Sequence, residues 1–160
     1  MLDFDTVYRE YAPRIRRFVL SLSGDAAIAE DITAETFVRV WSTRERVRHD
    51  TLRAFLFTIA RNLFLQGTRG RSRQRELTDT AADPSPGPDA VAIGRLDLGR
   101  VHAALAALDE ADRAAILLRA QEDLSYAEIG QSLGITPAAA RVRVHRARKR
   151  LHLALEGARR

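Results

Sequence analysis

Basic side chains near the C-terminal end of the 160-residue chain offer the first chemistry that the sequence suggests. Residues 135–160 hold eight basic residues and one acidic residue, a local charge of +7, and residues 67–75 add a second block of +4. One basic block is as often a solvated helix face as a binding site, but two blocks in a chain with a pI near 10.6 favour a polyanionic partner. Arginine makes bidentate hydrogen bonds to phosphates and guanine edges, so we expect DNA binding.

Residue types that carry catalysis or bind metals are scarce. The chain has no cysteine and four scattered histidines, and it lacks a glycine-rich phosphate loop and a cluster of carboxylates. We therefore expect no enzymatic activity, no cofactor and no metal site. The sequence also has no long apolar run and no secretory signal at residues 1–10, so we expect a cytoplasmic protein that does not insert into a membrane.

The composition favours helices over strands. Alanine, the best helix former, occurs 26 times, and only 10 residues are aromatic. Residues 81–88 contain three prolines and one glycine, a composition that breaks a helix and is typical of a flexible linker. We predict an all-α fold of two small helical domains joined by a flexible linker, with the first domain at 1–75, the linker at 76–99 and the second domain at 100–160.

Helical periodicity predicts three helices in the first domain, over residues 4–22, 26–41 and 51–66, with a charged loop at 42–50. The second of these helices has an outward face with two carboxylates edged by apolar residues: Asp31, Ala34, Glu35 and Val38. Such a face is either an ordinary solvated surface or a docking patch for another protein.

The third predicted helix runs into the first basic block. Its expected buried stripe consists of Leu52, Leu56, Ile59 and Leu63. Arg61 and Asn62 lie away from that stripe, and the arginines that follow are suited to lie along a phosphate backbone.

The second domain ends in a predicted helix–turn–helix. Ser125 and Glu128 have the spacing of a capping box, and Gly134 stands where a tight turn favours a residue without Cβ. Thr136 and Pro137 then start a basic helix. Its expected inner stripe is Ala140, Val144, Ala147 and Leu151, and opposite to it lie Ala138, Arg141, Val142, His145, Arg146 and Lys149. Helix–turn–helix proteins place such a face in the major groove of DNA.

Four segments resemble signatures of the extracytoplasmic-function sigma factors of bacterial RNA polymerase. They are AEDITAETFVRVW at 29–41, LFTIARN at 56–62, LSYAEIG at 124–130 and HRARKRL at 145–151. The resemblance covers both predicted domains, in the order of the family. It implies a protein that binds core RNA polymerase, directs it to promoters and helps to open the DNA.

The resemblance also implies roles for particular residues. Asp31, Ala34, Glu35 and Val38 match the surface that docks on the clamp helices of the largest polymerase subunit. The minus-ten element and the melted non-template strand would meet Val47, His49, Arg61, Asn62, Gln66 and Arg69. The duplex minus-35 element would meet Ser125, Thr136, Ala138, Arg141, Val142, Arg143, His145, Arg146 and Lys149. Family members are commonly held by an anti-sigma factor, and this sequence neither identifies nor excludes one.

The chain departs from the family pattern at two places. Val47 stands in the loop where the family usually has an aromatic residue that captures a flipped base, and AAARVR at 138–143 replaces the common GTVKSR. The promoter sequence is therefore not given by the resemblance.

Two further hypotheses stay open from the sequence. The alternative function is a stand-alone helix–turn–helix regulator, which would bind its operator without polymerase. The second hypothesis concerns charge: residues 76–99 carry −4 and residues 100–134 carry −3, so these acidic segments are candidates to mask the basic blocks before polymerase binds.

Overall fold

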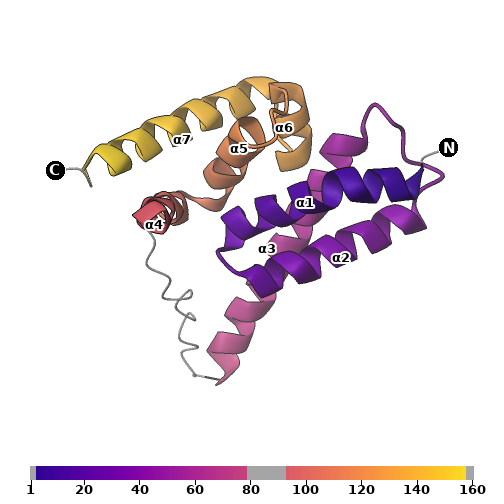
Figure 1. Ribbon diagram of the computed structural model, residues 1–160, viewed down its shortest axis with the longest axis horizontal. Helices are drawn as coiled ribbons and strands as arrows, with labels where there is room; N and C mark the ends of the chain where they lie inside the picture. The colour runs from indigo at the N-terminus through magenta and orange to yellow at the C-terminus, as the bar shows by residue number, and fades with distance from the viewer. Residues whose placement is uncertain (1–2, 79–92, 158–160) are drawn as a thin grey trace.

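The computed structural model describes residues 3–78 and 93–157, with side chains at 3–70 and 98–157. The regular structure of these ranges is helical throughout and consists of α1 (Phe4–Ser23), α2 (Ala26–Ser42), α3 (Leu52–Thr78), α4 (Ile93–Ala106), α5 (Glu110–Ala120), α6 (Tyr126–Leu133) and α7 (Pro137–Gly157). Helices α1–α3 form an N-terminal unit and α4–α7 form a C-terminal unit (Figure 1), which confirms the predicted all-α fold. Most of the predicted linker lies at 79–92, outside the described residues.

Local sequence explains the turn between α1 and α2. Gly24 has a φ of 72°, in the left-handed region that favours glycine, and its N–H donates to the Leu20 carbonyl at 2.8 Å. Asp25 then caps α2, because its carboxylate accepts hydrogen bonds from the backbone N–H groups of Ala27 and Ile28. The short turn lays α2 back along α1 (Figure 1).

The buried face of α3 differs in part from the predicted stripe. Leu52 and Leu56 are buried as expected, whereas Ile59 and Leu63 are half-buried and pack against the core, so the predicted stripe is confirmed in part. The fully buried Phe57 takes their place, because its ring meets Phe18 of α1 edge to face with centroids 5.3 Å apart. This packing rotates α3 relative to the predicted orientation.

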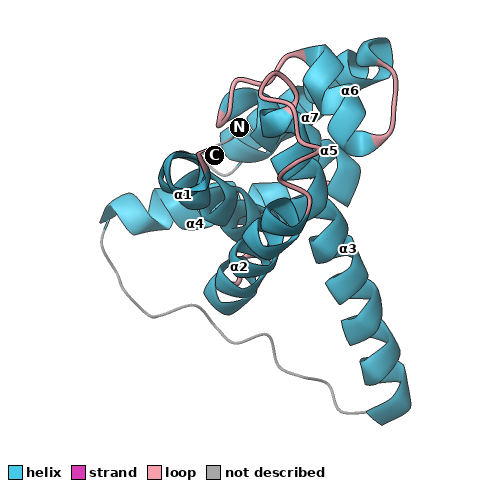
Figure 2. Cartoon of the chain, turned by 90° about the vertical axis from the view of Figure 1, so that its right-hand side faces the viewer, coloured by secondary structure: helices cyan, strands magenta, loops and turns pink. Residues whose placement is uncertain are grey.

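Helix α3 also continues well past its predicted end near Gln66. It runs to Thr78 and includes all four arginines of the first basic block, since arginine is a good helix former and no proline interrupts this stretch. Its C-terminal half projects away from the other helices (Figure 2). The first basic block therefore belongs to a helix rather than to a loop.

The helix–turn–helix is formed by α6 and α7, with the junctions that the sequence predicts. The Ser125 hydroxyl accepts from the Glu128 N–H and the Glu128 carboxylate accepts from the Ser125 N–H, both at 3.1 Å. Gly134 ends α6 with a φ of 70°. The Thr136 hydroxyl accepts from the N–H of Ala139 at the start of α7.

The two units pack directly against each other. Helix α1 contacts α4 and α5, and α3 contacts α6, so that a single cluster of buried apolar residues extends from Phe18 and Leu56 to Leu118 and Ile129. No helix of the described part of the chain is both long and apolar enough to cross a membrane. The packing gives the chain one continuous core in place of two small separate ones.

Candidate nucleic-acid and polymerase interfaces

The outward face of α2 is exposed, as its periodicity predicts. Asp31, Ala34, Glu35 and Val38 all lie at the surface, and 58% of Val38 is accessible to solvent. The Glu35 carboxylate accepts from Arg39 at 3.3 Å on the same helix. An exposed apolar side chain beside two carboxylates is a surface suited to another protein that presents basic groups next to an apolar side chain.

A pocket of about 720 Å³ opens beside the loop that follows α2. The guanidinium of Arg44 lies 3.9 Å from the centre of the Trp41 ring, and Phe4 meets that ring edge to face at 5.0 Å. The pocket is lined by Asp3, Phe4, Trp41, Arg44, Glu45, Val47 and His49. An aromatic ring and a guanidinium plane are the surfaces on which proteins stack unpaired bases.

The sequence alone did not single out Trp41 and Arg44 as candidate residues. The Trp41 side chain packs on Phe4, yet 48% of it is exposed. The sequence does contain a signal for this pair: Arg44 follows Trp41 by three residues at the end of a helix. At that spacing an arginine side chain can fold back over the aromatic ring. The structure thus provides an aromatic residue beside Val47, which is half-buried.

The minus-ten candidates on α3 divide into two groups. Asn62, Gln66 and Arg69 are exposed. Arg61 is not free: its Nε and Nη2 atoms donate to the two carboxylate oxygens of Glu110, at 2.8 and 2.6 Å. Only 12% of the Arg61 side chain is exposed.

Helix α7 carries the predicted minus-35 face. Ala140, Val144 and Ala147 are fully buried and Leu151 is half-buried, which confirms the inner stripe. The outward residues Ala138, Arg141, Val142, His145, Arg146 and Lys149 are exposed, and Arg143 is half-buried. Ser125 and Thr136 serve as helix caps at the turn, where their side chains are exposed. The side chains at the start of α7 leave its backbone accessible to a groove.

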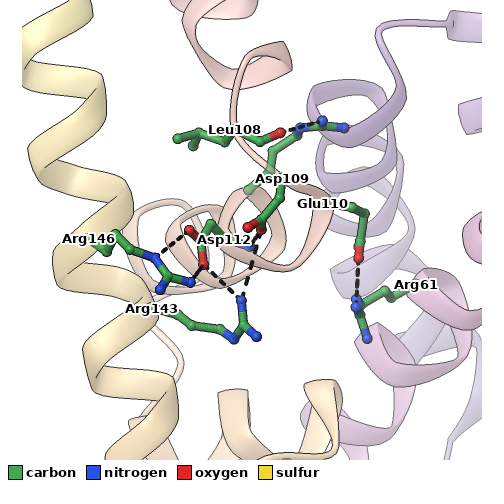
Figure 3. A network of polar contacts seen from close by, with 8 residues as sticks. Arg61, Leu108, Asp109, Glu110, Asp112, Arg143 and Arg146 are labelled. Atoms are coloured by element: carbon green, nitrogen blue, oxygen red, sulfur yellow. Dashed lines mark hydrogen bonds and ion pairs between the residues drawn. The ribbon is translucent and has the colours of Figure 1, made fainter.

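An acidic turn at the start of α5 binds arginines from both units (Figure 3). Asp112 is fully buried, and its two oxygens accept from Arg146 at 2.8 Å and from Arg143 at 3.0 Å. These hydrogen bonds, above all those from Arg146, hold the pKa of the Asp112 carboxyl below its ordinary value. Glu110, two residues earlier, faces the other way and binds Arg61 (Figure 3).

The candidate residues therefore form separate surfaces on the two units. The N-terminal unit presents the α2 face, the pocket at Trp41 and the exposed part of α3, and the C-terminal unit presents the outer side of α7. The acidic turn of α5 binds Arg61, a minus-ten candidate of the N-terminal unit. It also binds Arg143 and Arg146, two minus-35 candidates of the C-terminal unit.

Comparisons with known proteins match both units of the chain. Residues 7–74 match the family Sigma-70 region 2, and residues 98–151 match the family Sigma-70, region 4. The chain is 36% identical over 156 residues to the ECF RNA polymerase sigma factor SigL of Mycobacterium tuberculosis, covering 94% of this chain and 87% of SigL. It is equally similar to SigE of Mycolicibacterium smegmatis, of whose length it spans 61%.

A solved structure supports the same assignment. The sigma factor RpoE from Bartonella quintana, crystallised with the anti-sigma factor NepR, superposes with a TM-score of 0.81 and 30% sequence identity over 96% of this chain and 97% of that one. Both units, in their order along the chain, have counterparts in these relatives. The chain belongs to the extracytoplasmic-function family of sigma factors, the proteins that direct RNA polymerase to promoters.

Proposed function

We propose that this chain binds core RNA polymerase through the α2 face, reads the minus-35 element with α7 and holds the melted minus-ten strand with α3 and the pocket at Trp41. The observation that carries the proposal is the basic outer side of α7, exposed within a helix–turn–helix whose two helices are both capped at their N-terminal ends. The chain makes and breaks no bond itself, and it acts in the cytoplasm on promoter DNA. The domain that docks on polymerase and reads the minus-ten element spans residues 1–75, and the domain that reads the minus-35 element spans residues 100–160.

Run-off transcription tests the proposal against the alternative regulator. Core polymerase is mixed with the purified chain and a library of random genomic fragments, and the 5′ ends of the transcripts are sequenced. We expect transcripts that start downstream of one shared pair of sequence elements, absent with core polymerase alone. If the chain alone bound one operator and polymerase gave no specific transcription start, the result would favour the stand-alone regulator and contradict the sigma-factor function.

The pocket beside Val47 has side chains suited to an unpaired base of the minus-ten element. A base that leaves the duplex loses its stacking partners, and the Trp41 ring with the Arg44 guanidinium offers a replacement surface. Asp3 and Glu45 also line the pocket, and a carboxylate can accept a hydrogen bond from the amino group of a base. We infer that this pocket receives one unpaired base of the non-template strand.

Replacing Trp41 by alanine is expected to reduce promoter melting about tenfold, because stacking of one base on an aromatic ring contributes roughly 1–3 kcal/mol. The measurement is permanganate reactivity of unpaired thymines in the complex with polymerase. Tyr8→Ala is the matched control, since Tyr8 is 44% exposed and packs on Phe37 in the same aromatic cluster but does not line the pocket. Equal melting by the two variants would contradict the assignment of the pocket.

An anti-sigma factor belongs to the proposal as a partner. The RpoE relative was crystallised with NepR, and the CnrH structure, 24% identical with a TM-score of 0.74, holds the cytosolic domain of CnrY. We propose that this chain is likewise held by an anti-sigma factor until it is released to polymerase.

A further inference from the structure

One buried carboxylate holds two side chains of the reading helix. Asp112 is the third residue of α5, and its side chain is fully buried. The Arg146 guanidinium donates to it from Nε and from Nη2, both at 2.8 Å, and Arg143 donates from Nη1 at 3.0 Å (Figure 3). Both arginines belong to α7, so a neighbouring helix fixes part of the surface that is proposed to read DNA.

The position of Asp112 is itself well fixed. Helix α5 packs on α7, and Ala115 and Ala147 of these helices are fully buried. An acidic residue in the first turn of a helix is favoured by the helix dipole. The hydrogen bonds from Arg146 hold the pKa of the Asp112 carboxyl below its ordinary value, so the group is ionised at neutral pH. Asp112 is thus a stationary negative charge against which the two arginines are oriented.

Other basic side chains of α7 have no such partner. Arg141, Arg148 and Lys149 are exposed, and within the described part of the chain none of them pairs with a carboxylate. A long exposed side chain without a partner adopts several rotamers, so it can follow the phosphate backbone of DNA. Helix α7 therefore carries two kinds of basic residue, those that are free to adjust and the two that α5 holds.

Arg146 keeps hydrogen-bond donors for a further ligand. Asp112 uses Nε and one hydrogen of Nη2, while Nη1 has no hydrogen-bond partner among the described residues. The hydrogens of Nη1 and the second hydrogen of Nη2 form a fork at the end of the guanidinium. Because 43% of the side chain is exposed, this end can bind a ligand while the other edge stays on Asp112.

Arg146 also lies beside the centre of the outer face of α7. It follows Val142, which is 61% exposed, by four residues, or one helical turn and about 40° around the axis. Arg143 is less exposed, at 31%, and its Nη1 atom lies 3.9 Å from Asp109 as well. Of the two arginines that Asp112 holds, Arg146 is therefore the one placed to enter a groove of DNA.

The charge of Asp112 favours a base over a phosphate as that ligand. One aspartate beside two arginines lowers their combined charge from +2 to +1, which weakens a general attraction to phosphates. In return, a guanidinium that is oriented before binding loses less side-chain entropy when it meets its ligand. Guanine presents N7 and O6 side by side in the major groove, and the fork of an arginine matches this pair of acceptors.

We propose that Asp112 is a positioning residue for promoter recognition, which fixes Arg146 as the reader of one guanine in the minus-35 element. The proposal deepens the proposed function and rests on the DNA-reading role of α7. Asp112 meets no DNA itself and acts through Arg146. Arg143 completes the pairing of the buried carboxylate.

Replacement of single guanines by 7-deazaguanine tests the proposal, because this analogue lacks the N7 acceptor and keeps O6. Polymerase assembled with the chain is titrated onto a fluorescent promoter fragment found by run-off transcription, with each guanine of the minus-35 element replaced in turn. We expect one guanine at which the parent loses affinity about tenfold. At the same guanine Asp112→Asn should lose about twofold or less, because an amide has one acceptor oxygen and cannot hold both nitrogens of Arg146.

Binding to duplex DNA of random sequence separates positioning from a purely structural role. Asp112→Asn removes a negative charge beneath the DNA-facing helix, so we expect its affinity for random duplex to equal or exceed that of the parent. If Asp112 served only to hold α5 on α7, the variant would bind both DNAs more weakly and would still discriminate against 7-deazaguanine as the parent does. Unchanged discrimination in a folded Asp112→Asn variant would overturn the proposal.

A second variant covers the case in which Asp112→Asn loses helical content by circular dichroism. Arg146→Lys keeps the charge at an exposed position and removes the fork, so we expect the same loss of guanine discrimination, with no further loss when Asp112→Asn is added. Matched controls are Arg148→Lys on the same helix and Asp123→Asn, which removes the partner of Arg119. Both should keep the tenfold effect of the parent. An equal loss by Arg146→Lys on random duplex would assign Arg146 to a phosphate and contradict the proposal.

Failure of this proposal is distinguishable from failure of the proposed function. A parent that directs specific transcription but has no guanine sensitive to the loss of N7 would contradict the roles of Asp112 and Arg146 and leave the sigma-factor function in place. If the chain instead bound an operator without polymerase, the same scan of that operator would test Asp112 after the sigma-factor function had failed.

Discussion

The double change Asp31→Arg with Glu35→Arg is expected to weaken binding to core RNA polymerase about a hundredfold or more. Both residues are exposed on the same face of α2 as Val38, so that the surface presents two negative charges to its partner. Reversing them places like charges against a partner surface that is complementary to carboxylates, which costs several kcal/mol, and each 1.4 kcal/mol is about tenfold in Kd. The affinity is measured by fluorescence anisotropy of the labelled chain titrated with core enzyme.

The matched control for this change is Asp123→Arg with Glu156→Arg. These residues carry the same total charge change, are exposed on the C-terminal unit and lie far from α2 in the sequence. We expect the control to bind polymerase with the affinity of the parent. A similar loss in both double variants would assign the effect to net charge and remove the docking role of the α2 face.

Val142→Glu is expected to abolish specific recognition of the minus-35 element. Val142 is 61% exposed at the centre of the outer face of α7, one turn from the start of the helix, where helix–turn–helix proteins contact base edges. A carboxylate there meets the negative potential of the groove and removes an apolar side chain from the base edges, where a good contact contributes roughly 1–3 kcal/mol of discrimination. The readout is a gel-shift or footprint of the polymerase complex on a promoter found by run-off transcription.

Leu153→Glu provides an unusually close control on the same helix. Leu153 is 59% exposed, and it lies 11 residues beyond Val142, about 16 Å along the axis and within about 20° of the same face. We expect promoter recognition by this variant to match that of the parent, because the C-terminal part of such a helix lies beyond the base edges. Equal losses in both variants would mean that α7 binds DNA through charge alone.

The sequence was sufficient to predict features that depend on neighbouring residues. The capping box of Ser125 and Glu128, the left-handed Gly134 and the buried stripe of α7 were predicted correctly, because each follows from contacts within a few residues. The outward α2 face was predicted for the same reason. Local rules for helix ends and amphipathic periodicity carry this information.

The contacts between the units could not be predicted in this way. Arg61 and Glu110 are separated by 49 residues, and Arg53 and Glu128 by 75 residues. Their pairing depends on how two helical units dock, and the periodicity of either helix contains no such information. Arg61 was therefore predicted as a DNA contact, although in the structure it has Glu110 as an internal partner.

The rotation of α3 has a similar explanation. Periodicity places Leu52, Ile59 and Phe57 on overlapping apolar faces, and the choice among them depends on a ring–ring contact with Phe18 of another helix. The deciding partner of Phe57 thus lies in a different helix.

The first turn of α5 holds side chains of both units through one helix cap. The Asp109 carboxylate accepts from the Asp112 N–H at 2.8 Å, Glu110 pairs with Arg61 of α3, and Asp112 pairs with Arg146 of α7. Loss of this cap would loosen both ion pairs at once, because the two carboxylates stand in the turn that the cap fixes. A single local helix signal thus sets contacts with residues 49 positions earlier and 34 positions later in the chain.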